Sequence, residues 1–180
     1  YRGLGIEDHL AVLQRVDKID KIGPDAVRTL LIEEVGLDED AADTCLALAT
    51  ISSADTSFVE RVRALGVQHE LLDEGLDALA AVVTAAAAAV PGRLVADLKI
   101  ARGLDYYTGT VYETELVGHE KLGSICSGGR YDALASDGKR TFPGVGISVG
   151  VTRLLAPLIA RGDLVASRSV PTCVLVAVDA

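Results

Sequence analysis

The sequence lacks several residue types and patterns that mark common functional classes. Its 180 residues include no methionine, no tryptophan, two phenylalanines, three cysteines and three histidines. The cysteines are far apart without a C-x-x-C pair and the histidines are scattered, so neither zinc-ligand spacing nor a Ser/His/Asp or Cys/His arrangement is present. We expect free thiols in a cytoplasmic protein and no protein-bound metal.

Other absences concern membranes, targeting and nucleic acids. The longest apolar run, residues 78–90, is alanine-rich and too short to span a bilayer, so we expect no membrane association. The sequence contains no methionine and begins at Tyr1 without a signal-peptide pattern. We therefore expect it to be an excised internal fragment. The formal net charge of −9 argues against an autonomous nucleic-acid-binding domain, because such domains present a basic face to phosphates.

The first half of the chain has helical periodicity. Gly23-Pro24-Asp25 begins one helix with proline near its first position, and a second helix is expected from Glu39 to Ile51. The longest is expected from Glu70 to Val90, where leucine and valine recur at helical spacing before Pro91-Gly92 stops the run. We therefore expect residues 9–92 to be all-helical.

After Gly92 the helical spacing of apolar residues ends, and residues of two kinds begin to alternate along the chain. Residues 94–100 alternate in the way that a half-buried strand requires. Further strands are expected at residues 111–117 and 122–127, joined as a hairpin by the polar loop 118–121. Because consecutive strands without intervening helices pair antiparallel, the predicted fold class is α+β.

The strand expected at residues 144–150 has side chains on one face only. Valine and isoleucine at alternate positions form an apolar face. The other positions leave a nearly bare face: Gly144, Gly146, Ser148 and Gly150. A flat ligand can lie on that face, and residues 151–159 then follow as a helix with Arg153 in its first turn. The glycine spacing fails both the P-loop and the G-x-G-x-x-G patterns, so a Rossmann site is not expected.

The strongest candidate site is the stretch from Arg102 to Glu113, which joins an arginine, two glycines and three tyrosines in a chain poor in aromatic residues. The Arg102 guanidinium can donate two parallel hydrogen bonds to phosphate or carboxylate oxygens of a ligand. The alternative to ligand binding is an ion pair at the protein surface. Tyr106 and Tyr107 are adjacent on an extended backbone, which predicts that they point to opposite faces. At most one of them then lines a given pocket.

A second candidate stretch runs from Cys126 to Asp132. Gly128 and Gly129 lie where the backbone must turn or where a ligand must come close. Both explanations remain open from the residues alone.

These stretches, in this order, resemble the motifs of one enzyme family. The segment Arg102–Glu113 closely resembles the signature motif of histidyl-tRNA synthetase, a class II aminoacyl-tRNA synthetase. Ser127–Asp132 is similar to the family's second histidine-site motif, and Gly144–Leu154 is similar to motif 3 of the class. Val16–Lys21 is similar to part of a helical insertion found in one branch of the family. Together the resemblances cover nearly the whole chain.

The resemblance implies a class II synthetase-type antiparallel sheet portion with a helical insertion domain. Residues 1–8 would end a preceding segment of the catalytic core, 9–92 would form the insertion, and 93–162 would form the C-terminal half of the core. Residues 163–170 would be a linker and 171–180 the start of the anticodon-binding domain. Because motifs 1 and 2 of the class are absent, we expect this piece alone to be inactive.

The resemblance also implies roles for single residues. Arg102, the catalytic residue, would contact the α-phosphate of ATP and stabilise the charge that grows during attack by the histidine carboxylate. Tyr107 and Tyr131 would line the imidazole pocket, with Tyr106 packed behind. The implied histidine-binding set is Tyr106, Tyr107, Gly128, Gly129 and Tyr131. The implied ATP-binding set is Arg102, Gly144, Gly146, Ser148, Gly150 and Arg153.

The activity implied for the intact protein is ligation of histidine to tRNA(His). ATP would be a substrate accompanied by Mg²⁺, and the enzyme would be a cytoplasmic homodimer. Two other interpretations stay open. One is a non-catalytic synthetase-like module, such as the regulatory subunit of ATP phosphoribosyltransferase or a kinase-linked tRNA sensor, although these usually degrade the arginine-tyrosine motif that is intact here. The other is a structural interaction fragment built on the helical half.

Overall fold

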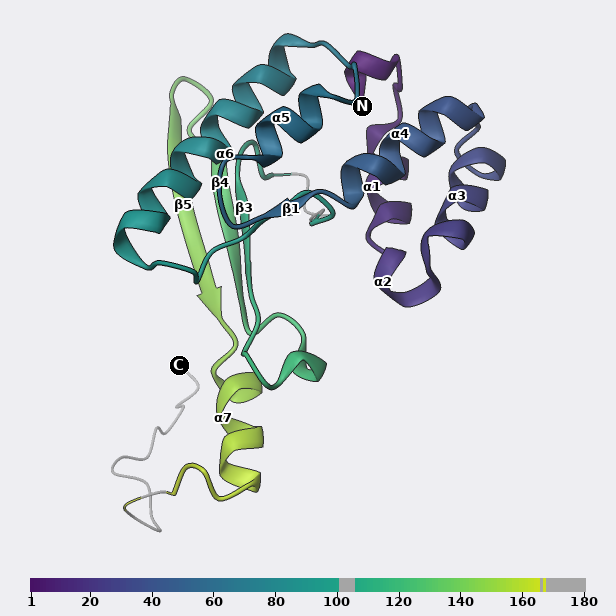
Figure 1. Cartoon of the computed structure of the whole chain (residues 1–180). Helices are drawn as coiled ribbons and strands as arrows, with labels where there is room; N and C mark the ends of the chain where they lie inside the picture. Colours follow the sequence, from purple (N-terminus) through teal and green to yellow (C-terminus); the bar gives the residue numbers. More distant parts are fainter. Residues whose placement is uncertain (101–105, 166, 168–180) are drawn as a thin grey trace, which may run out of the picture. The chain divides into compact units, whose positions relative to one another are not determined.

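The computed structural model describes residues 1–100, 106–165 and 167 (Figure 1). Its helices are η1 (Arg2–Leu4), α1 (His9–Val16), α2 (Ile19–Ile22), α3 (Pro24–Glu33), α4 (Glu39–Ala49), α5 (Phe58–Arg63), α6 (Glu70–Ala89), η2 (Glu120–Leu122) and α7 (Val151–Ala160). Its strands are β1 (Ser52–Ser53), β2 (Ala96–Asp97), β3 (Val111–Thr114), β4 (Cys126–Ser136) and β5 (Thr141–Val149).

The chain forms two compact units. The first comprises Tyr1–Tyr112 and Gly128–Gly146, and the second comprises Glu113–Ser127 and the described residues from Ile147 onward. The predicted domain boundaries follow sequence motifs and not this division, so they remain predictions. Residues 171–180, predicted to begin the anticodon-binding domain, lie outside the described residues.

Local sequence signals start the helices α3 and α4, as predicted. Pro24 is the first residue of α3, where its missing N–H costs nothing, and it follows Gly23 at φ 84°. The Asp38 carboxylate accepts a hydrogen bond of 2.7 Å from the backbone N–H of Ala41 and so caps α4.

Two separate hydrophobic cores stabilise the helical part of the first unit. The core of α1 to α4 consists of Ile6, Val12, Val16, Val27, Leu31, Ala42, Cys45 and Ala49. The core that joins α5, α6 and β2 consists of Ile51, Phe58, Val62, Leu76, Val83 and Ala96. Leu76 and Val83 belong to the helical stripe predicted for α6, which confirms that interpretation.

Helix α6 contains one glycine, Gly75, with empty space where a side chain would lie. A Cβ atom added to Gly75 would meet nothing within 4 Å. Since glycine loses more backbone entropy in a helix than alanine does, we expect Gly75→Ala to raise the free energy of unfolding by about 0.5–1 kcal/mol. Urea unfolding followed by circular dichroism measures this change, and a loss of stability would show that α6 is packed differently.

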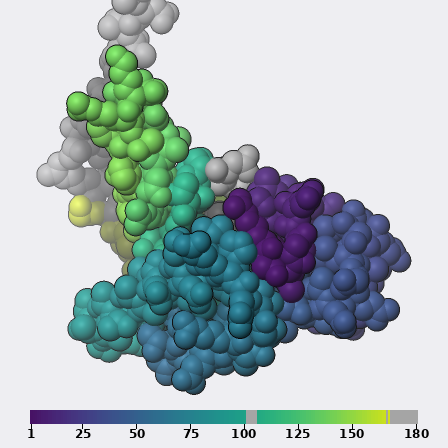
Figure 2. Space-filling view, turned by 90° about the horizontal axis from the view of Figure 1, so that it is seen from above, coloured from purple at the N-terminus to yellow at the C-terminus, as the bar shows by residue number. Residues whose placement is uncertain are grey.

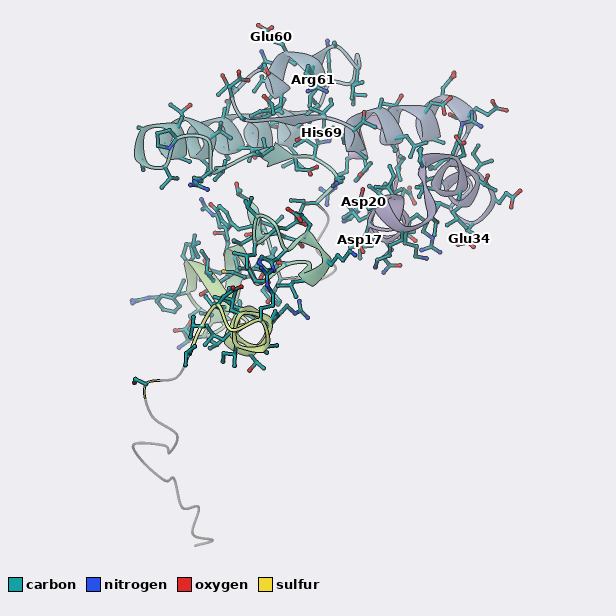
Figure 3. The ribbon with its side chains drawn as sticks, turned by 60° about the horizontal axis from the view of Figure 1, so that its bottom comes forward. Asp17, Asp20, Glu34, Glu60, Arg61 and His69 are labelled. Carbon is teal, nitrogen blue, oxygen red and sulfur yellow. The ribbon has the colours of Figure 1, made fainter. Side chains whose placement is uncertain are left out.

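The strand predicted over residues 94–100 is shorter than expected. Only Ala96 and Asp97 form β2, which pairs antiparallel with β1 in the half that was predicted to be all-helical. The Asp97 carboxylate accepts a hydrogen bond of 3.1 Å from the backbone N–H of Lys99, and this side-chain turn ends the strand. Arg61 of α5, labelled in Figure 3, donates to the Ser52 carbonyl of β1 at 2.8 Å.

Charged side chains connect the helices of the first unit to this small sheet. The Lys99 ammonium lies 2.9 Å from a carboxylate oxygen of Asp20, which is labelled in Figure 3 together with Asp17. Asp20 is exposed, so this ion pair lies at the surface. An exposed pair of this kind contributes little to stability.

The larger sheet has the strand order β3-β4-β5. The backbone N–H of Arg130 donates to the carbonyl of Thr110, and the backbone N–H of Ile125 donates to the carbonyl of Thr114. Strands β3 and β4 therefore run antiparallel, as predicted. The strand predicted at residues 122–127 is wrong in its bounds, because η2 and Gly123 at φ 63° occupy its first residues. The chain becomes a strand only at Cys126 and continues to Ser136.

Candidate functional site

The tyrosine pair differs from its predicted arrangement. Arg102, the predicted catalytic residue, lies outside the described residues. Tyr106 and Tyr107 do not point to opposite faces, because their ring centroids are 4.5 Å apart at an interplanar angle of 52°. The chain is not a regular strand at these residues, so strand alternation does not apply. Tyr106 is exposed and Tyr107 is half-buried, which contradicts the expectation that Tyr106 packs behind.

The glycine pair of β4 lies within a strand and not in a turn. Gly128 and Gly129 are both buried. A Cβ atom on Gly129 would lie 2.8 Å from Cδ1 of Tyr107 and 3.0 Å from the carbonyl oxygen of Thr110. Gly129 therefore permits a close approach, but the approaching group is the protein's own Tyr107 ring and not a ligand. The alternative prediction of a turn is wrong, and the predicted approach of a ligand stays a prediction.

The face predicted to be bare on β5 is partly covered. A Cβ atom on Gly144 would lie 2.6 Å from Cε2 of Tyr131, and one on Gly146 would lie 3.5 Å from Cε1 of the same ring. The Tyr131 phenol of β4 therefore lies against both glycines. The sequence pattern missed this contact because it depends on the register of β4 against β5, which the sequence alone does not give.

Three residues that the sequence interpretation did not assign, Thr108, Arg130 and Asp132, join this site. The Thr108 hydroxyl donates a hydrogen bond of 2.7 Å to Oδ2 of Asp132, and Nε of Arg130 donates one of 3.0 Å to Oδ1 of the same carboxylate. These bonds from Thr108 and then Arg130 hold the pKa of Asp132 below its ordinary value. One signal was available, since Arg130 and Asp132 are two residues apart and so share a strand face.

The remaining ATP-site candidates belong to the second unit. The exposed Arg153 lies in the first turn of α7, as predicted, and its Nη1 donates to the Ser124 carbonyl at 2.7 Å. Gly150 precedes α7 and donates its backbone N–H to Ile125 at 2.8 Å. Ser148 is exposed near the end of β5.

The predicted residues thus fall into two groups. The first unit brings together the tyrosine pair, the β4 glycines and tyrosine, and the first two glycines of β5: Tyr106, Tyr107, Gly128, Gly129, Tyr131, Gly144 and Gly146. The second unit holds Ser148, Gly150 and Arg153. The first group consists of tyrosine rings next to strand glycines, and the second has a guanidinium beside a helix start.

A cavity of about 300 Å³ lies elsewhere in the first unit, and its lining includes none of the predicted site residues that the structure describes. Its lining is largely apolar, and Figure 2 shows the first residues of the chain, in purple, against the blue helical residues. Burial raises the pKa of the Cys45 thiol in this lining to about 11, so the thiol is protonated at neutral pH. The lining also includes Tyr1, Arg2, His9 and His69, and the cavity lies apart from the described residues predicted to bind histidine and ATP.

The described part of the chain has neither a cluster of metal-binding side chains nor a membrane-spanning helix. Within residues 1–100, 106–165 and 167, no group of three or more histidine, cysteine, aspartate or glutamate side chains could hold a metal ion. In those same ranges, no helix combines the length and apolar character needed to cross a bilayer.

Comparison with known proteins identifies the family. Residues 23–154 match the model of the histidyl-tRNA synthetase family. The chain is 69% identical over 179 residues to a histidine-tRNA ligase of Cutibacterium acnes, covering 99% of this chain and 39% of the relative. It is 65% identical over 180 residues to a histidine-tRNA ligase of Micrococcus luteus, covering 100% of this chain and 39% of the relative.

A solved structure agrees with the sequence matches. The crystal structure of histidyl-tRNA synthetase from Nostoc sp. PCC 7120 superposes with a TM-score of 0.80 at 37% identity, covering 91% of this chain and 39% of that one. The mixed α+β fold is thus one that an aminoacyl-tRNA synthetase adopts. The chain belongs to the histidyl-tRNA synthetase family. It spans about two fifths of the length of the relatives it matches.

Proposed function

We propose that this chain supplies part of the histidine and ATP sites of an enzyme that ligates histidine to tRNA(His). The observation that carries the proposal is the grouping of Tyr107, Gly129 and Tyr131 in one unit, on residues that resemble the family's two histidine motifs. The identity of 69% to a histidine-tRNA ligase supports the same reaction.

The proposed reaction has two steps. A carboxylate oxygen of histidine attacks the α-phosphorus of ATP, the bond to the departing pyrophosphate breaks, and histidyl-adenylate forms. The terminal ribose hydroxyl of tRNA(His) then attacks the acyl carbon, and AMP leaves. Negative charge increases on the phosphoryl oxygens during the first attack, so a guanidinium already in place stabilises the transition state more than the ground state. We assign this role to Arg102.

The histidine subsite is proposed to select its ligand by polarity. Tyr107 and Tyr131 have phenol hydroxyls that can bond imidazole nitrogens, while Gly128 and Gly129 keep the strand free of side chains next to them. Tyr106 belongs to the same subsite through its contact with Tyr107. A site built to bond buried polar atoms discriminates strongly against a side chain that lacks them.

The ATP subsite is proposed to use β5 and the start of α7. Gly144, Gly146, Ser148 and Gly150 would present backbone to the nucleotide, with Tyr131 bordering the first two. Arg153 would meet the base and γ-phosphate end of ATP. Mg²⁺ would arrive with the phosphates, since this ion is usually held by one or two carboxylates together with the substrate.

We further propose the assembly and location that the family resemblance implies. The sheet β3-β4-β5 with α7 would be a class II catalytic portion, and residues 9–92 would be a helical insertion. The whole protein would act as a homodimer in the cytoplasm. Since the chain spans 39% of its relatives, we expect residues 1–180 alone to be inactive.

Transfer of labelled histidine to tRNA(His) tests the proposal. We expect a whole-length protein that contains this chain to charge tRNA(His) with histidine in the presence of ATP and Mg²⁺, and we expect the 180-residue chain alone to charge none. Binding of tRNA(His) without charging by the whole-length protein would point instead to a non-catalytic sensor or regulatory module. Charging by the isolated chain would contradict our view of it as part of a site.

A further inference from the structure

A charged hydrogen-bond network lies next to the proposed histidine subsite, and the assignments above give it no role. Asp132 accepts one bond on each carboxylate oxygen, from Thr108 at 2.7 Å and from Arg130 at 3.0 Å. Because both bonds favour the charged form, the pKa of Asp132 stays low and the carboxylate is ionised at neutral pH. The side chains of Arg130 and Asp132 are 57% and 41% exposed, so solvent screens their ion pair, and the network matters here for the position that it gives Thr108.

Backbone hydrogen bonds also join Thr108 and Thr110 to Arg130. The N–H of Thr108 donates to the carbonyl of Arg130 at 3.0 Å, and the N–H of Arg130 donates to the carbonyl of Thr110 at 3.0 Å. Gly109 lies between them, where a Cβ atom would come within 3.0 Å of Cδ of Arg130. Residues 108–110 are therefore held against one residue of β4 by both backbone and side-chain bonds.

The two faces of β4 carry different groups of residues. A Cβ atom on Gly129 would point at the Tyr107 ring, and Tyr131 shares that face because it is two residues further along the strand. Arg130 and Asp132 belong to the opposite face. Thr108 follows Tyr107 directly in the chain, so a bond that fixes Thr108 on one face also limits where the Tyr107 ring can lie on the other.

We propose that Asp132 is a positioning residue that acts through Thr108 to hold the Tyr107 phenol at the spacing from Tyr131 that histidine requires. The inference rests on the proposed function. Asp132 need not touch histidine or ATP itself, and its effect is specific to the amino-acid subsite. Small displacements of positioning groups can cost large factors in rate, so the effect is measurable.

The test measures pyrophosphate exchange by the whole-length protein with Asp132→Asn. An asparagine carbonyl can accept from Thr108 or Arg130 but carries no charge, and its amide adds a donor. We expect the KM for histidine to rise about tenfold, consistent with loss of charged hydrogen bonds, while the KM for ATP and kcat stay within about twofold. An unchanged KM for histidine would overturn the proposal.

Thr108 provides a second and independent test. Thr108→Val removes the hydroxyl at nearly constant size, and we expect it to raise the KM for histidine in the same way. Thr108→Ser restores the donor and should return the KM to within about twofold of the unmodified value. If Asp132→Asn does not fold, this pair decides the question, since equal KM values for the valine and serine variants would contradict the proposed role.

Asp137 offers a matched control on the same hairpin. Its carboxylate accepts from the backbone N–H groups of Lys139 and Arg140 in the β4–β5 turn. Asp137→Asn makes the same chemical change and should leave the KM for histidine unaltered. A parallel rise in both KM values, for histidine and for ATP, would show a general structural role and would overturn the proposal. Absence of exchange in the unmodified whole-length protein would instead mean that the proposed function has failed.

Discussion

Arg102→Ala in the whole-length protein is expected to slow histidine-dependent pyrophosphate exchange by about 100-fold to 1,000-fold, the usual loss for one donor to a developing oxyanion. The effect should fall mainly on kcat, because the guanidinium is needed most when charge builds up on the α-phosphate. Arg102→Lys keeps the charge but loses the planar fork, so we expect an intermediate rate.

A matched arginine separates this effect from a general loss of charge. Arg93 is exposed, nine residues earlier in the chain, and belongs to none of the proposed subsites. Arg93→Ala should leave the exchange rate within about twofold of the unmodified protein, as surface substitutions usually do. If Arg102→Ala also left the rate unchanged, the chain would be better explained as a structural fragment.

Gly129→Ala is expected to damage the histidine subsite and the fold together. The added methyl would lie 2.8 Å from Cδ1 of Tyr107 and 3.0 Å from the carbonyl oxygen of Thr110, so at least one group must move. Overpacking of a buried position typically costs about 1–3 kcal/mol of stability. Because displacement of the Tyr107 ring also alters the subsite, we expect the KM for histidine to rise about tenfold or more.

Two comparisons test whether the loss of stability in Gly129→Ala comes from the contact with the Tyr107 ring. Gly75→Ala makes the same change in open space and is expected to stabilise the chain slightly. In a Tyr107→Ala background, the Gly129→Ala substitution should lose less stability than it does alone, because one of its two close contacts is gone. Urea unfolding measures both, and equal losses in the two backgrounds would show that the ring is not the obstacle.

The parts of the fold that could be predicted depend on contacts near in sequence. The start of α3 at Pro24, the Asp38 cap of α4 and the apolar stripe of α6 are all set by residues within a few positions of one another. The period change after Gly92 correctly indicated strands. It gave the wrong extent for β2, because the Asp97 side-chain turn competes with strand pairing at Lys99.

The parts that could not be predicted depend on pairing between distant segments. The Gly128–Gly129 pair is equally compatible with a turn, and the contact of Gly129 with Tyr107 joins segments that no local pattern relates. The contact of Tyr131 with Gly144 requires the register of β4 against β5. The Thr108–Asp132 bond joins residues 24 positions apart, so no local pattern points to it.

The central claim is that this chain carries part of a histidine-activating site. The most direct test is pyrophosphate exchange by the whole-length protein with each amino acid in turn. We predict exchange with histidine and exchange lower by several orders of magnitude with phenylalanine, whose ring has no nitrogen to bond the tyrosine hydroxyls. Equal exchange with both amino acids, or none with histidine, would contradict the claim.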